Sequence, residues 1–244
     1  MRRESGTTLI EVLIAVTLLS LLSVGMLTAM RVGFMAFSKT SNKLMDNRRV
    51  AGAQRVVQEQ LEGMMPVVAP CGEAPAATPA KTAFFEGQPE TMRLVSTFSL
   101  QQGWRGQPQI LELFTIPGED GRGVRLVVNE IPYTGPAGTA QLCTGRTRDP
   151  LTGSNLAVFA PVQAGPNSFV LADKLAYCRF SYFTIPLDRN LPQHWTPQWT
   201  FSGWPYAVRI EMAPLDPDPS RLQPITVTAP IHIHRSPEIQ YVDY

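Results

Sequence analysis

The sequence is poor in charge and histidine and lacks the common catalytic motifs. Asp, Glu, Lys and Arg make up 17% of its 244 residues, against roughly 25% in an average soluble protein. The formal net charge is +1, so the sequence lacks the basic surface of a nucleic-acid-binding protein. No G-x-S-x-G, S-x-x-K, H-E-x-x-H or P-loop pattern occurs. We therefore expect no enzymatic activity, no cofactor and no nucleic-acid partner.

Potential metal ligands are few and poorly spaced. His232 and His234 would share one face of a strand, and two such histidines can bind a metal. No third ligand stands at a fixed spacing from them. The acidic turns 118–121 and 216–218 lack the alternating ligands of a calcium loop. The sequence predicts no metal site, and we interpret both histidines as surface side chains.

Cysteine is also scarce, with three residues and no C-x-x-C motif. An odd number allows at most one disulfide within the chain. Cys178 alternates with the aromatic residues Phe180 and Tyr182, which suggests a buried thiol. Cys71 and Cys143 lie in loop-like segments and are our first choice for a disulfide, which an exported domain can form.

What the sequence does contain is one long apolar run, Val12 to Met30, without charged residues, amides, histidine or proline. Its 19 residues would form a helix of about 28 Å, enough for a hydrocarbon core of ~30 Å. Arg2 and Arg3 precede it and favour a cytoplasmic N-terminus. A secretory signal peptide has a shorter apolar core and an A-x-A-like cleavage site. A plain membrane anchor is the other alternative.

Glu11 directly precedes this run, although a carboxylate near the bilayer core is costly unless it is paired. It can also be interpreted as a first-turn acid that favours the helix dipole. Its surroundings, Ser5-Gly6-Thr7-Thr8-Leu9-Ile10-Glu11, resemble the class III signal of type IV pilins and type II secretion pseudopilins. In that family a prepilin peptidase cleaves after the glycine and methylates the new N-terminus. The resemblance implies cleavage between Gly6 and Thr7, N-methylation of Thr7 and an assembly role for Glu11, although the family most often has Phe in place of Thr7.

The absence of proline before Pro66 allows one helix from about Thr8 to Met65. Its second half carries an apolar stripe that predicts packing on a folded head, formed by Val50, Ala53, Val57, Leu61 and Met64. We expect a leader at 1–6, a transmembrane part at 7–30, an amphipathic part at 31–65 and a β-rich head at 66–244.

The head is predicted to contain short antiparallel strands, since proline accounts for 22 of the 244 residues and alternating segments are bounded by turns. Residues 117–121 predict a hairpin turn, and residues 66–79 a connection without its own helix. The expected strands are Thr91–Leu100, Gln109–Ile116, Gly123–Pro132, Leu156–Pro161, Phe169–Ala172, Leu175–Thr184, Ala207–Ala213 and Ile225–His234. Helices do not alternate with these strands, which excludes a Rossmann-type sheet and leaves an α+β fold.

A second resemblance covers residues 175–213 loosely. Aromatic residues at the end of a strand, the pair Trp195 and Trp199, and Pro205 before an apolar strand are similar to J-type minor pseudopilins of type II secretion. This resemblance implies a pilin-like head and a structural role near the pseudopilus tip. It also implies a single-pass inner-membrane protein with a periplasmic head, which would assemble with I-, K- and H-type minor pseudopilins and the major pseudopilin.

Two alternatives remain open at this stage. A W-type minor pilin of a type IV pilus would share the fold but belong to the pilus assembly system instead of the type II secretion system. A membrane-anchored periplasmic binding domain would have no filament role, and Glu11 would then have no function in assembly.

Overall fold

The computed structural model describes residues 8–71, 81–99, 104–150, 153–185, 192–216 and 224–232. It contains two compact units, Met1–Arg49 and Val50–Tyr244. The second unit, called the head below, includes the last turns of the long helix. It thus begins before the boundary predicted at residue 66, because Val57 and Leu61 are buried in its core.

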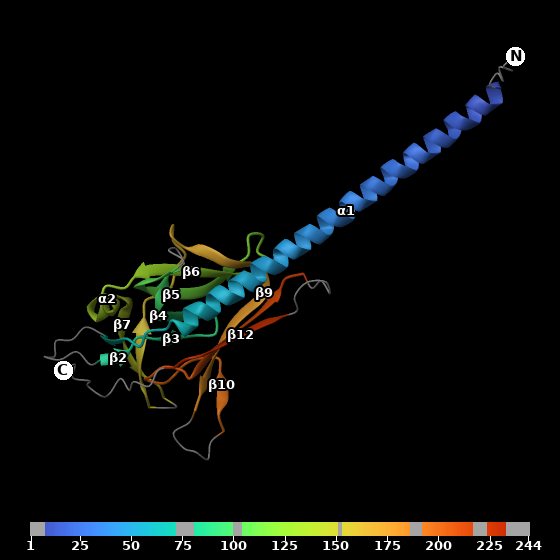
Figure 1. Cartoon of the computed structure of the whole chain (residues 1–244). Coiled ribbons are helices and arrows are strands. Elements are labelled where there is room, and N and C mark those ends of the chain that lie inside the picture. The colour runs from blue at the N-terminus through green and yellow to red at the C-terminus, as the bar shows by residue number, and fades with distance from the viewer. Residues whose placement is uncertain are drawn as a thin grey trace. The chain divides into compact units, whose positions relative to one another are not determined.

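The helix α1 runs without interruption from Leu9 to Glu62 (Figure 1). The small and polar residues near its middle, such as Gly33 and Ser38, do not break it. It ends where Gly63 donates a backbone hydrogen bond of 3.0 Å to the carbonyl oxygen of Glu59, and Pro66 follows shortly afterwards. The helix therefore covers most of the predicted span from Thr8 to Met65.

The head is built on an antiparallel sheet with the strand order β12-β11-β9-β6-β5-β4-β3, and β10 pairs with part of β9. Its described strands are β3 (Glu86–Gly87), β4 (Thr91–Ser99), β5 (Trp104–Pro117), β6 (Val124–Pro132), β9 (Phe169–Thr184), β10 (His194–Thr196), β11 (Ala207–Pro214) and β12 (Ile225–Pro230). β3 to β6 form a meander, and the predicted turn at 117–121 joins β5 to β6. In this turn the Gly118 N–H donates a hydrogen bond of 3.0 Å to the carbonyl oxygen of Gly123.

Smaller elements lie outside this sheet. β1 (Val68–Pro70) pairs with β2 (Lys81–Ala83), and β7 (Cys143–Arg148) pairs with β8 (Asn155–Phe159). The helix α2 (Pro136–Thr139) and a 3₁₀ turn (Ala140–Leu142) precede β7. Of these elements only β8 is predicted from the sequence, because the others are very short or rich in glycine, threonine and arginine.

The predicted strands 169–172 and 175–184 prove to be a single strand, β9. Lys174 between them adopts a positive φ of 54°, and the pairing with β6 shifts register over this region. β9 pairs with β6 through its first residues and with β11 from Leu175 onward. The last strand, predicted to span Ile225–His234, ends at Pro230 in the structure. His234 lies outside the described residues.

Alternation along β4 buries side chains on both faces of the sheet. Leu94 belongs to the larger core cluster, together with Val57 and Leu61 of α1. Val95 belongs to a second cluster with Val67 and Phe84. The predicted stripe of α1 is therefore buried at Val57 and Leu61 and half-buried at Met64, while the side chains of Val50 and Ala53 lie outside the described residues.

A long apolar N-terminal helix followed by an antiparallel sheet gives an α+β arrangement. It is the arrangement predicted from the sequence, and it is consistent with the pilin-like fold.

Candidate functional site

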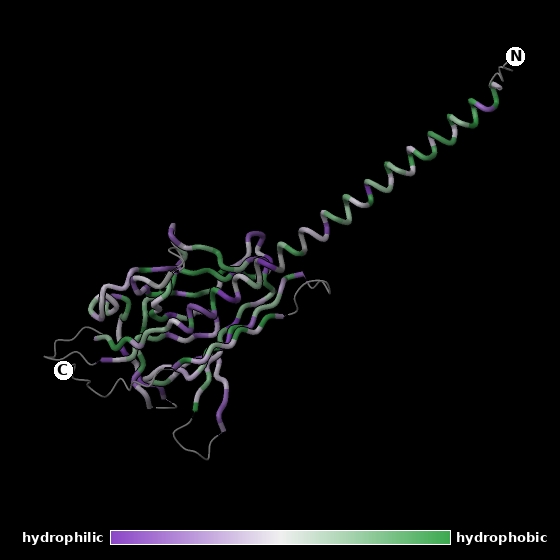
Figure 2. Tube along the Cα trace, viewed as in Figure 1, coloured by the Kyte–Doolittle hydropathy of each residue, from purple (hydrophilic) through white to green (hydrophobic). Residues whose placement is uncertain are grey.

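The N-terminal part of α1 has the properties of a membrane span. Residues Leu9–Ser41 have a mean hydropathy of 2.3 over their most apolar window, and none of that window is buried. Figure 2 shows hydrophobic colours over the first turns of α1 and more hydrophilic ones toward its C-terminal end. An unburied apolar helix of this length exceeds what a ~30 Å hydrocarbon core requires. This single helix supports anchoring in a membrane.

The polar side chains within the run Val12–Met30 are all satisfied by the helix itself. The hydroxyls of Thr17 and Ser20 donate to carbonyl oxygens three residues earlier, each at 2.8 Å. Ser23 donates to Leu19 at 2.8 Å, and Thr28 donates to Val24 and Gly25 at 2.9 and 2.8 Å. Because lipid offers no hydrogen-bond partners, such internal bonds make these hydroxyls compatible with a hydrocarbon environment.

Glu11 lies in the first turn of α1 and is the acidic residue of an otherwise acid-free segment from Leu9 to Ser41. Its backbone N–H donates to the carbonyl oxygen of Thr8 at 3.0 Å. The carboxylate is exposed and forms no ion pair with the residues that the structure describes. Gly6 and Thr7, the predicted cleavage and methylation positions, lie outside the described residues.

The head contains a buried ionic cluster centred on Arg93 of β4. Its guanidinium donates to Glu86 Oε2 at 2.6 Å and, through Nε, to Glu112 Oε1 at 2.9 Å. Nη2 donates to the carbonyl oxygen of Ala160 at 2.8 Å, and the group lies 5.1 Å from the ring centroid of Phe159. Arg93 is 1% exposed, so the cluster fixes the segment 159–160 against β4.

The two carboxylates of this cluster differ in their surroundings. Glu112 is buried, and its second oxygen accepts a 2.8 Å bond from Asn129. Glu86 is only half-buried and lines a pocket of about 210 Å³. Burial raises the pKa of Glu86 above its ordinary value, Arg93 opposes this shift, and the nearby Glu112 adds to it. Glu86 is thus the member of the cluster that a ligand can reach.

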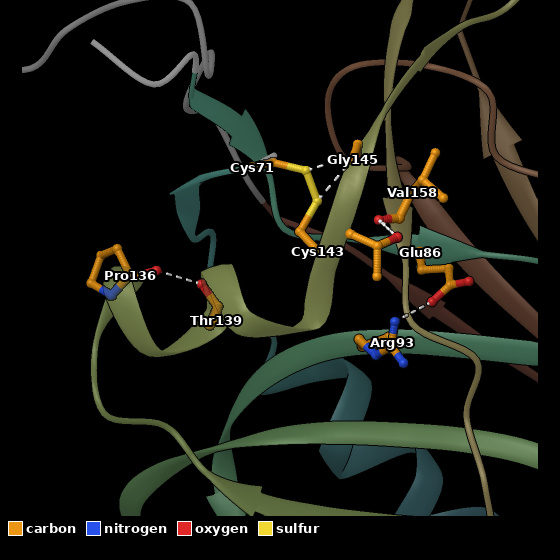
Figure 3. The surroundings of a disulfide bond; sticks show 9 residues. Cys71, Glu86, Arg93, Pro136, Thr139, Cys143, Gly145 and Val158 are labelled. Carbon is orange, nitrogen blue, oxygen red and sulfur yellow. Dashed lines mark hydrogen bonds and ion pairs between the residues drawn. A yellow bond between two sulfur atoms is a disulfide. The ribbon is translucent and has the colours of Figure 1, made fainter. Parts of the chain in front are cut away.

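Cys71 and Cys143 form a disulfide with a Cα–Cα distance of 5.4 Å, between the end of β1 and the start of β7 (Figure 3). This is the pair that the sequence favours. The remaining cysteine, Cys178, is free and buried on β9. Burial raises the pKa of its thiol to about 12, and the charge of Glu90 contributes.

Several residues of the second resemblance lie on the neighbouring strands β9 and β11, whereas Trp199 and Pro205 lie outside the strands. Phe180 pairs with Ile210, and Tyr182 pairs with Val208, across β9 and β11. All four side chains are buried in the larger core cluster. Trp199 joins that core, and its indole N–H donates to the carbonyl oxygen of Gly203 at 2.8 Å. Phe180, Tyr182 and Trp199 therefore serve the packing of the head, whereas Trp195 on β10 is half-buried.

The histidines give no metal centre among the described residues. His232 and His194 are exposed, and His234 lies outside the described part of the chain. No group of three or more metal-ligating side chains gathers within that part.

A family model described as the prokaryotic N-terminal methylation motif matches residues 1–27. The match covers Gly6, Thr7, Glu11 and most of the apolar run. It supports a subunit of the type IV pilin-like or pseudopilin type. Such a subunit assembles with other pilin subunits and is processed by a prepilin peptidase. No curated protein matches the chain.

The Arg93 cluster and its pocket are the features that sequence reasoning misses. The sequence does contain a signal for the cluster, namely a charged residue between two apolar ones. Arg93 lies between Met92 and Leu94, and Glu112 lies between Leu111 and Leu113. A charged residue flanked by apolar ones in a strand can face solvent on a one-sided sheet. Here both faces of β4 are covered, and the register of β4 and β5 places Arg93 directly opposite Glu112.

Proposed function

We propose that the chain is a minor pseudopilin of J type, a structural subunit near the tip of the type II secretion pseudopilus. The motif match at residues 1–27, the apolar helix and the antiparallel head support this proposal. So does the packing of the J-like residues of β9 and β11 in one core. The prepilin peptidase removes residues 1–6, and the subunit remains a single-pass inner-membrane protein with a periplasmic head.

The observation that carries the proposal is the position of Glu11. It is the acidic residue of the apolar segment, and cleavage after Gly6 places it four residues beyond the new N-terminus. An α-amino group titrates near ~7.7–8.0, so it is mostly protonated at pH 7. One helical turn rises 5.4 Å, so a neighbouring subunit displaced axially by about one turn brings its amine to Glu11. In the apolar bundle of a filament, an unpaired carboxylate would be costly.

The test is removal of this charge from the full-length protein in a host with a type II secretion system. We expect Glu11→Ala and Glu11→Gln to leave the leader cleaved and the head folded. Both should reduce recovery of I-, K- and H-type partners from detergent-solubilised membranes, and both should reduce secretion. Lys39→Gln, which removes a charge from the same helix, is the matched control and should behave as wild type. Full secretion and normal partner recovery with Glu11→Ala would contradict the proposal and favour a plain membrane anchor.

The W-type minor pilin of a type IV pilus shares every feature above and is the second candidate. The same variants separate the two machines, because loss of surface pili with intact secretion would favour the pilus. A gene neighbourhood with a secretion ATPase and I- and K-type pseudopilins would favour the secretion system.

A further inference from the structure

The pocket beside Glu86 is lined by four parts of the head. They are residues of β2, β3 and their flanks between Thr82 and Gln88, Thr147 of β7, β8 (Asn155–Phe159), and Gln198, Trp199, Phe201 and Ser202. At about 210 Å³ the pocket exceeds the ≈30 Å³ share of a single water severalfold. It therefore has room for a side chain from another molecule.

Glu86 is the one charged residue in this lining. Its Oε2 is bonded to Arg93, whereas Oε1 makes no hydrogen bond with the described residues. Figure 3 shows one oxygen of Glu86 facing Arg93 and the other directed away from it. One guanidinium faces two carboxylates in the cluster, so their combined formal charge is negative. A partly buried net negative charge attracts a cation.

The walls of the pocket suit an organic cation better than a metal ion. Trp199 and Phe201 line it, with ring centroids 4.8 Å apart, and aromatic faces attract ammonium and guanidinium groups. A calcium ion instead takes six to eight oxygen ligands with several carboxylates, and this lining offers one. An arginine or lysine side chain meets both features, a carboxylate oxygen and an aromatic wall.

The backbone of β8 adds a second recognition element. Among the described strands β8 pairs only with β7. Hydrogen bonds at both ends of the β7–β8 pair fix which backbone groups face β7. The Asp149 N–H donates to the carbonyl oxygen of Ser154 at 2.9 Å, and the Ala160 N–H donates to that of Leu142 at 2.9 Å. Because backbone groups alternate in direction along an antiparallel strand, those of Ala157 point away from β7. An open edge of this kind can accept an extended peptide as a further strand.

We propose that this pocket binds a basic side chain, arginine or lysine, presented by an extended segment of a partner protein that pairs with the free edge of β8. Glu86 Oε1 receives the N–H of the basic group, and Trp199 with Phe201 forms the wall beside it. The proposal concerns the head alone and does not depend on the role of Glu11.

Peptide binding to the full-length protein in a neutral detergent tests this site. The probe is a fluorescein-labelled pentapeptide, threonine-valine-arginine-valine-threonine, followed by fluorescence anisotropy. Otherwise identical peptides carry lysine, glutamate or citrulline, a neutral group with the shape of arginine. We expect the arginine and lysine peptides to bind at least ten-fold more tightly than the citrulline and glutamate peptides.

Variants assign the binding to the pocket. Glu86→Gln should remove the preference for arginine over citrulline, whereas Glu119→Gln, at an exposed carboxylate of the β5–β6 turn, should retain it. Ala157→Pro removes a backbone N–H donor at the open edge of β8 and retains Glu86. It should weaken the arginine peptide at least five-fold, which keeps the test valid if Glu86→Gln lowers the melting temperature.

Three results would overturn the proposal. The first is equal affinity of the arginine and citrulline peptides. The second is an unchanged preference in a folded Glu86→Gln protein. The third is binding of calcium ions in this pocket together with no binding of any of the peptides.

Discussion

The Ser96 hydroxyl on β4 donates a 3.0 Å hydrogen bond to the backbone carbonyl oxygen of Gln60 on α1. Close by, the Thr97 N–H donates to the carbonyl oxygen of Gly63 at 2.8 Å. The last carbonyl groups of a helix have no partner within the helix, and here β4 supplies a partner for Gln60 and for Gly63, the residue that follows the helix. The end of α1 is thus bound to the sheet by backbone groups as well as by apolar packing.

Leu61→Asp should destabilise the head severely, because it places a carboxylate at a position that is 1% exposed. A buried unpaired carboxylate costs several kcal/mol, a large share of a domain's stability. Thermal unfolding of the full-length protein in detergent measures the effect. Arg55→Asp, on the exposed side of the same helix segment, should cost only about 0.5 kcal/mol. Similar melting temperatures for the two variants would contradict the assignment of the buried face.

The mature protein should begin at Thr7, because Gly6 precedes the Thr-Thr-Leu-Ile-Glu sequence and the methylation motif covers residues 1–27. Intact-mass measurement of protein from a host with prepilin peptidase tests this, and one added methyl group is expected. Protein from a peptidase-deficient strain is the control and should keep the leader. A mature chain that starts near residue 30 would instead indicate a conventional signal peptide.

Arg93→Ala should unfold or strongly destabilise the head, because it leaves Glu112 buried without its cation. Removing one partner of a buried ion pair costs roughly 3–5 kcal/mol, which chemical denaturation can measure. Arg122→Ala is the control, since the contact of Arg122 with Asp216 spans 3.8 Å between exposed side chains and such pairs are worth about 0–1 kcal/mol. An equal loss in both variants would show that burial of the Arg93 cluster is not what stabilises it.

Cys178 should be unreactive in the folded protein, because it is buried and its thiol pKa is raised to about 12. A thiol reagent at pH 8 should label none of the cysteines natively, one after unfolding without reductant and three after reduction.

The same thiol predicts a pH effect. Its pKa rises on folding from an ordinary 9.0 to about 12, so its contribution to stability is complete below pH 9 and is lost as the pH rises toward 12. Cys178→Ala should therefore lose less stability than wild type between these values. Rapid native labelling at pH 8 would contradict the burial of this thiol.

Gly87→Ala should destabilise the head through overpacking. A Cβ at Gly87 would lie 2.7 Å from Cζ of Tyr182 and 2.8 Å from Cβ of Trp199, and such crowding typically costs about 1–3 kcal/mol. Gly145→Ala is the control, because a Cβ there meets no atom within 4 Å. Equal stability of both variants in denaturant titrations would show that the two rings move aside freely.

Periodicity predicted the long elements well and the short ones poorly. The helix to Glu62 and the strands β4, β5, β6 and β11 each carry a sustained apolar pattern, which local sequence can report. β3 contains only Glu86 and Gly87, and its pairing with β4 depends on neighbours distant in the sequence. A strand of that length has no period to detect.

The N-terminal candidate site is indicated by the sequence alone, whereas the pocket in the head is visible only in the structure. Gly6, Thr7 and Glu11 lie within one short segment and follow a linear motif, so their order alone indicates the chemistry. The pocket instead combines Glu86, Ala157 and Trp199, which only the sheet topology and the packing of β8 bring together. Sequence can show that Arg93 and Glu112 are unusual, but not that they meet.

The single strand β9 also determines the order in which the head can be completed as the chain is synthesised from its N-terminus. Its early residues pair with β6 and its later ones with β11, and Lys174, with its positive φ, lies near the point where the two pairings meet. The chain between Pro132 and Phe169 must be closed as a loop before this pairing forms, which makes the step slow relative to the local meander β3–β6. Because β6 precedes β9 in the chain, β6 keeps an open edge until residues 169–184 have been synthesised. β11 and β12 can join the sheet only after β9 is in place, because β9 lies between them and β6.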